Sequence, residues 1–228
     1  MKPLPFGSTA VMARRSEPPS SLDYFPTPPW ATRALLEHVL LPLGLSNPAK
    51  ECVWEPACGE GHMSAVLTEY FRHVSASDVF PYGHGNVTDF LSTAYVSLSP
   101  DWIITNPPFK TAEEFAHRAI GLASKGAALL VRSAWLEGEG RFTRLFQPCP
   151  PAIVAQFCER VPMVKGRWDP KASSATSYSW VVWLKGPAVG GTVFMWIPPG
   201  QRAALTRPDD VLRFAPRAPA PLFDEVAA

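Results

Sequence analysis

The chain has 228 residues, of which 46% are hydrophobic, and its formal net charge at pH 7 is only +1. This length suits one α/β domain with a substantial core. The small net charge gives no overall basic field, so any contact with nucleic acid must come from a local patch. The sequence has no apolar run of membrane-spanning length, and its start lacks the apolar core of a signal peptide.

The four cysteines and five histidines do not follow the spacings of metal ligands. No CxxC pair occurs among Cys52, Cys58, Cys149 and Cys158, so we predict reduced thiols rather than zinc ligands or disulfides. We therefore expect a cytoplasmic protein with no bound metal and no membrane association.

The distribution of proline divides the chain into three parts. Residues 1–22 are rich in Pro, Ser and small residues, which predicts a flexible N-terminal arm. Residues 23–199 carry the patterns of regular structure and are expected to form the domain. Residues 200–228 alternate Pro, Ala and charged residues, so we expect a mostly disordered tail.

Thr27 and Pro28 predict the start of the first helix. Threonine is a good N-cap, and proline suits the first helical position. Apolar residues at positions 35, 36, 39 and 40 then recur with helical spacing.

A glycine loop joins a predicted strand at 51–55 to a predicted helix at 63–71. Such a loop lets a ligand approach the backbone closely, beside the start of a helix. The spacing differs from the Rossmann Gly-x-Gly-x-x-Gly motif. The loop residues are Pro56, Ala57, Cys58, Gly59, Glu60 and Gly61.

Two acidic residues follow the glycine loop. Asp78 ends a predicted strand at 73–79, where a carboxylate suits hydrogen bonds to ribose hydroxyls. An Asp at a strand end is also common in turns. Asp89 precedes Phe90, and an N-cap of a short helix explains Asp89 as well as any binding role.

The segment 101–109 combines an apolar run with an abrupt stop. Residues 101–105 predict a short buried strand, which Pro107 and Pro108 end because proline cannot donate to a ladder. Asn106 offers a side-chain oxygen and Pro107 a backbone oxygen, two acceptors that suit the hydrogens of a planar NH2 group. Phe109 offers a flat face for a ring. An ordinary strand followed by a proline turn is the alternative.

The rest of the chain changes from alternating helices and strands to strands alone. A helix is expected after Lys110, and strands are expected at 126–135, 152–161 and 177–185, with 192–197 a candidate edge strand. This order predicts an α/β fold with a mostly parallel sheet, an antiparallel end and helices on both faces.

The loop at 162–174 is a candidate nucleic-acid contact. Lys165, Arg167 and Lys171 could meet phosphates, together with Lys110 after the proline turn, and Trp168 could stack on a base or wedge between bases. A solvated surface loop is the alternative explanation.

Taken in order, these motifs resemble class I S-adenosylmethionine-dependent amino-methyltransferases over roughly residues 23–199. The carriers of the resemblance are the Phe-x-Thr-Pro element, the glycine loop, Asp78, Asp89 and Asn-Pro-Pro-Phe. The resemblance is to DNA N6-adenine methyltransferases of phage or prophage type. It implies a Rossmann-like, seven-stranded sheet and S-adenosylmethionine as the cofactor.

The resemblance also implies the residues of the cofactor site. The Thr27-Pro28 element and the glycine loop would cradle the cofactor, and Asn106 would border it. Glu55 would lie near the methionine ammonium, and Asp78 would bind the ribose. Asp89 would accept from the adenine amine of the cofactor, and Phe90 would pack on its ring.

For the acceptor, the resemblance implies an adenine flipped out of double-stranded DNA. Its amine would be held by Asn106 and Pro107, within a turn completed by Pro108, and its ring would stack on Phe109. Asn106 departs from the commonest pattern of the DNA enzymes, which have Asp there. The same chemistry on an RNA base or a protein glutamine amide is therefore an alternative. A non-catalytic nucleic-acid-binding protein that retains the fold is another.

Overall fold

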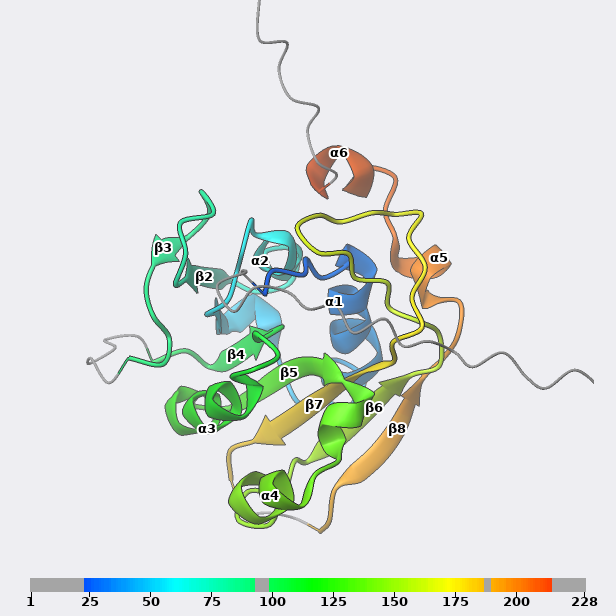
Figure 1. Ribbon diagram of the computed structural model, residues 1–228. Coiled ribbons are helices and arrows are strands. Elements are labelled where there is room, and N and C mark those ends of the chain that lie inside the picture. The colour runs from blue at the N-terminus through cyan, green and yellow to red at the C-terminus, as the bar shows by residue number, and fades with distance from the viewer. Residues whose placement is uncertain (1–22, 93–98, 187–189, 215–228) are drawn as a thin grey trace, which may run out of the picture.

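The computed structural model describes residues 23–92, 99–186 and 190–214. Its strands are β1 (Cys52–Glu55), β2 (His73–Asp78), β3 (Asn86–Val87), β4 (Trp102–Thr105), β5 (Gly126–Arg132), β6 (Ile153–Phe157), β7 (Tyr178–Leu184) and β8 (Val193–Ile197). Within the described residues they form one sheet in the order β3-β2-β1-β4-β5-β7-β6-β8 (Figure 1). β7 is antiparallel to β5 and β6, whereas the other pairs are parallel.

This architecture confirms the predicted fold class. The sheet is mostly parallel, with an antiparallel stretch where β7 enters between β5 and β6. It has eight strands within the described residues rather than seven, because the short, unpredicted β3 adds to β2, while β8 takes the edge position expected for 192–197.

Helices pack on both faces of the sheet (Figure 1). The α-helices are α1 (Pro29–Leu35), α2 (His62–Leu67), α3 (Ala112–Leu122), α4 (Glu139–Arg141), α5 (Gln201–Leu205) and α6 (Asp210–Phe214). Short 3-10 turns occupy Pro48–Lys50 and Ser133–Leu136, and π-helical turns occupy Leu36–Leu40 and Phe142–Phe146.

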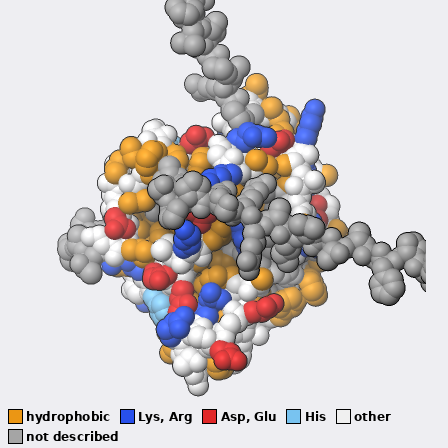
Figure 2. All heavy atoms as spheres, viewed as in Figure 1, with side chains coloured by type: hydrophobic (Ala, Val, Ile, Leu, Met, Phe, Trp, Pro, Cys, Tyr) orange, Lys and Arg blue, Asp and Glu red, His pale blue; other side chains and the backbone are white. Residues whose placement is uncertain are grey.

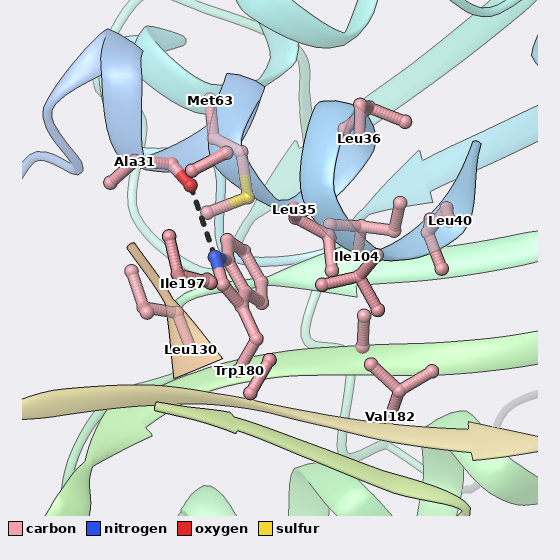
Figure 3. Packing of buried hydrophobic residues seen from close by; sticks show 14 of the residues in the cluster. Ala31, Leu35, Leu36, Leu40, Met63, Ile104, Leu130, Trp180, Val182 and Ile197 are labelled. Atoms are coloured by element: carbon pink, nitrogen blue, oxygen red, sulfur yellow. Dashed lines mark hydrogen bonds between the residues drawn. The ribbon is translucent and has the colours of Figure 1, made fainter. Parts of the chain in front are cut away.

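The central strands are buried on both faces, because alternate side chains enter two apolar cores. Ile104 of β4 lies in the core under α1 and α2, and its neighbour Ile103 lies in the core under α3. Figure 3 shows the first core, where the Trp180 indole donates to the Ala31 carbonyl over 3.0 Å. This packing on both faces holds the carboxyl ends of the central strands in place.

The first helix begins two residues after Thr27. Pro28 has extended backbone angles (φ −55°, ψ 134°), and no side chain caps the helix. Pro28 is itself followed by Pro29, and a residue before proline avoids the helical conformation. The predicted N-cap role of Thr27 and first-turn role of Pro28 are therefore wrong, and Pro29 takes the first helical position.

The expected disordered tail is also wrong for residues 200–214, which form α5 and α6. Asp210 is 0% exposed and forms a two-pronged ion pair with the buried Arg33, with both N–O distances 2.7 Å. Arg33 also donates to Glu69. Composition could not reveal a partner 177 residues away. The predicted arm at 1–22 and residues 215–228 lie outside the described residues.

Replacing Asp210 by Ala should destabilise the protein strongly. The change leaves the buried Arg33 with one partner fewer, and the loss of one member of a buried pair costs about 3–5 kcal/mol. Urea unfolding measures the difference. The control is Asp209→Ala, which removes a carboxylate that is 57% exposed and should change the free energy of unfolding by about 0.5 kcal/mol or less. Equal effects of the two changes would contradict the role of the ion pair.

Candidate active site

A cavity lies at the carboxyl edge of β1, β2 and β4, where polar residues from separate parts of the chain meet. Parallel strands bring their carboxyl ends to the same edge, which is where open α/β sheets bind ligands. The lining residues are Asp23, Tyr24, Phe25, Pro26, Thr27, Glu55, Ala57, Cys58, His62, Met63, Asp78, Val79, Tyr82, Asn106, Pro107, Pro108 and Phe109.

The glycine loop follows β1 and adopts a conformation that favours glycine. Gly59 (φ +51°) and Gly61 (φ +89°) are both left-handed. A Cβ at Gly59 would lie 2.2 Å from the Tyr24 ring, and one at Gly61 would lie 2.6 Å from the His84 ring. The Tyr24 and His84 side chains thus lie close against the backbone of the loop. Neither glycine nor the buried Pro56 lines the cavity.

Glu55 ends β1 as a buried carboxyl group that is 2% exposed. Its Oε2 is buried and has no hydrogen-bond partner in the described part of the chain. Burial raises the pKa of Glu55 well above its ordinary value, and the nearby Asp78 charge adds to the rise, although Ser64 opposes it. Burial and the same two carboxylates raise the pKa of Cys58 to about 12, so its thiol is not a nucleophile at neutral pH.

Asp78 ends β2 and bonds to the glycine loop. One carboxylate oxygen accepts from the Gly59 N–H over 2.9 Å, and the other accepts from the Phe80 N–H over 3.0 Å. Glu55 and Asp78 therefore bring two carboxyl groups to the same cavity.

Asn106 follows β4 and lines the same cavity. Its Nδ2 donates to the Phe25 carbonyl over 2.9 Å, which fixes the orientation of the amide. Its Oδ1 is buried and has no hydrogen-bond partner among the described residues. A buried acceptor without a partner is unfavourable, so this oxygen is ready for a donor.

Sequence reasoning missed the contribution of residues 23–25, which we call the strap. The Asp23 carboxylate accepts from the Phe109 N–H over 2.6 Å, and the Tyr24 ring covers Gly59. The strap thus touches both the proline turn and the glycine loop. Within the strap, only Phe25 had a sequence signal, as the first residue of the Phe-x-Thr-Pro element.

His62 also was not predicted, and it connects the strap to the C-terminal helix. Burial lowers the pKa of His62, so the ring is neutral. Its Nε2 donates to the Phe214 carbonyl (3.0 Å), which leaves Nδ1 to accept from the Tyr24 hydroxyl (3.3 Å).

Asp89 and Phe90 do not line the cavity. Phe90 is 2% exposed and packs in the core against Trp54 and Phe115, with ring centroids 5.1 and 4.8 Å away. Asp89 is exposed and accepts from the Leu91 N–H, a bond typical of an N-cap, although the described residues 90–92 form a turn and not the short helix of the alternative. The predicted packing of Phe90 on a cofactor ring does not fit this burial.

The loop at 162–174 contains a core residue that had been expected at the surface. Trp168 is 4% exposed and packs against Phe214 and Val66, so it is not available to stack on a base. Arg167 and Lys171 are exposed, Lys165 is half-buried, and Lys110 is exposed after the proline turn. Figure 2 shows basic and acidic side chains interspersed on the visible face rather than gathered into one basic patch.

The described part of the chain has neither a cluster of metal-ligating side chains nor a membrane-spanning helix. No group of three or more His, Cys, Asp or Glu residues there could hold a metal ion. No helix there is both long and apolar enough to cross a membrane.

The sequence matches no protein-family model and no curated protein, whereas the fold matches many solved structures. A Listeria monocytogenes protein described as a class I S-adenosylmethionine-dependent methyltransferase aligns with a TM-score of 0.53 at 12% identity, over 85% of this chain and 70% of its own.

Two further matches are larger proteins. One is a Vibrio vulnificus protein described as a modification subunit of a type I restriction enzyme (TM-score 0.54, 15% identity, 83% of this chain and 51% of its own). The other is a Streptococcus thermophilus type I restriction-modification methyltransferase subunit (TM-score 0.54, 10% identity, 75% of this chain and 47% of its own). The chain spans about half the length of each. The chain therefore has the fold of the class I S-adenosylmethionine-dependent methyltransferases.

Proposed function

We propose that the protein is an S-adenosylmethionine-dependent N-methyltransferase that acts on an exocyclic amine, specifically N6 of an adenine flipped out of DNA. The observation that carries the proposal is the buried Asn106 Oδ1, which has no partner among the described residues and lies in the wall of the cavity that Glu55 and Asp78 also line.

The polar groups of the cavity suit S-adenosylmethionine, which supplies the methyl group when bound. Glu55 has a buried oxygen without a partner in the described chain, suited to an ammonium group. Asp78 stands at the strand end where a carboxylate suits ribose hydroxyls. Thr27 lines the same cavity, together with Ala57 and Cys58 of the glycine loop.

The acceptor chemistry follows from the proline turn. Asn106 Oδ1 and the Pro107 carbonyl would accept the two hydrogens of the amine, so that the nitrogen lone pair points at the methyl group. S-adenosylmethionine, held by Glu55 and Asp78, would supply the methyl group for the new N–C bond, with its C–S bond breaking as that bond forms. The nitrogen would then lose a proton to water. Catalysis would come mainly from positioning and electrostatics rather than from a strong base.

A DNA substrate would require the adenine to leave the base stack, because its amine cannot reach the cavity inside a duplex. Two proteins with this fold are described as belonging to type I restriction systems, which supports a nucleic-acid substrate. Lys110, Lys165, Arg167 and Lys171 are the candidate phosphate contacts. Trp168 is excluded by its burial.

Transfer of labelled methyl groups tests the proposal directly. Unmethylated genomic DNA, total RNA and a protein extract are each incubated with the protein and labelled S-adenosylmethionine. Label recovered as N6-methyladenine in DNA is the expected result. Label found only in RNA or only in protein would keep the chemistry and overturn the substrate.

Asn106→Ala should reduce methyl transfer by about 10²–10³-fold, because it removes a positioned polar group at the reacting nitrogen. Cofactor binding, measured by calorimetry, should persist. Asn106→Asp keeps an acceptor oxygen and should retain part of the activity, and Asn86→Ala is the exposed control. Equal loss of transfer and cofactor binding in Asn106→Ala would contradict the assigned role.

Cofactor binding should become stronger as the pH rises toward the raised pKa of Glu55 in the free protein. Burial raises the pKa of Glu55, whereas a bound ammonium would favour its carboxylate, so binding releases a proton. The affinity should rise by up to about tenfold per pH unit between the pKa of Glu55 in the complex and its pKa in the free protein. Glu55→Gln should bind more weakly and without this dependence. A calorimetric pH profile that is unchanged by Glu55→Gln would rule out the assignment.

A further inference from the structure

The Phe109 ring is not freely exposed to solvent on all sides. The Arg132 guanidinium lies over the ring, 3.9 Å from its centroid, as a cation–π contact. Arg132 also interacts with the buried Tyr178 hydroxyl, which helps to hold it there. One face of Phe109 is therefore covered from the side of β5.

The other neighbouring ring belongs to Phe25 in the strap. The two ring centroids are 5.2 Å apart and the planes are inclined by 38°, so that the rings form a wedge. Phe25 and Phe109 are both half-buried and line the cavity with Asn106. The Phe25 carbonyl is also the group that accepts from Asn106 Nδ2. The wedge and the free Asn106 oxygen thus belong to one connected site.

We propose that Phe25 is the second wall of the acceptor site, so that the acceptor is a planar ring held between Phe25 and Phe109, with its amine at Asn106 Oδ1. This inference rests on the proposed function and makes it more specific, because the aliphatic amide of glutamine has no ring to fill such a wedge. Sequence reasoning assigned only Phe109 to the acceptor.

The wedge must open slightly to admit a ring. Two stacking contacts of about 3.5 Å place the outer rings about 7 Å apart, compared with 5.2 Å in the structure. Rotation of the Phe25 side chain can provide this space without breaking the bond to Asn106, because that bond uses the backbone carbonyl. Phe109 stays in place, since its N–H is bonded to Asp23 and its ring is covered by Arg132.

The test compares Phe25→Ala, Phe25→Leu and Phe25→Tyr in the full chain. Leu keeps apolar volume but has no flat face, whereas Tyr keeps the face. Phe194→Ala is the matched control, because it removes an exposed ring from the edge strand β8. The substrate is a single-stranded, adenine-containing oligonucleotide. A copy with 2-aminopurine in place of adenine reports stacking by fluorescence quenching, without turnover.

The Ala and Leu variants should raise KM for the oligonucleotide by about tenfold or more, as expected for the loss of a stacking partner. They should also lose most of the quenching, while calorimetry shows unchanged S-adenosylmethionine affinity. The Tyr variant and the control should behave like the wild-type protein.

If the wild-type protein methylates the oligonucleotide, two results would overturn the role of Phe25 and leave the proposed function standing. One is wild-type KM and quenching in Phe25→Ala. The other is loss of cofactor affinity in parallel with KM, which would make Phe25 a wall of the cofactor site. A wild-type protein that methylates only glutamine in a peptide would overturn the DNA proposal and the ring clamp together.

Discussion

The two prolines after Asn106 constrain the centre of the site. Neither Pro107 nor Pro108 can donate a backbone hydrogen bond, so β4 ends there and the turn cannot be held by the sheet ladder. The next N–H, that of Phe109, is bonded to Asp23, and the Asn106 amide is bonded to the Phe25 carbonyl. The strap from another part of the chain therefore supplies the contacts that the sheet cannot give to this turn.

The sequence predicted those parts of the site that depend on strand ends. Glu55, Asp78 and Asn106 follow apolar, β-forming runs, and in a parallel sheet such residues meet at one edge. Local patterns were also sufficient to predict β7 and β8, because both strands lie in the strand-rich second half of the chain. The same patterns could not distinguish Phe90 and Trp168 from surface aromatics, since burial depends on partners such as Phe115 and Phe214 that are distant in sequence.

Electrostatics divides the cavity into two sides. One wall carries Glu55 and Asp78, and their mutual repulsion together with burial favours a proton on Glu55. Asn106, which lines the same cavity, presents a neutral amide, and Arg132 lies over Phe109. The two carboxyl groups favour a cationic ligand, whereas the amide and the Phe109 ring suit a neutral planar group. In the proposed reaction, these would be the environments of the methyl donor and of the acceptor.

The C-terminal helix has a consequence for the synthesis of the protein. Phe214 bonds to His62, 152 residues earlier, and Asp210 bonds to Arg33. A ribosome makes the N-terminal part of a chain first, so the glycine loop and the proline turn leave the ribosome before α6 does. His62 and Tyr24 then lack the contact that orders them. The cavity therefore reaches its final form only after α6 has left the ribosome, and ligand binding waits for that step.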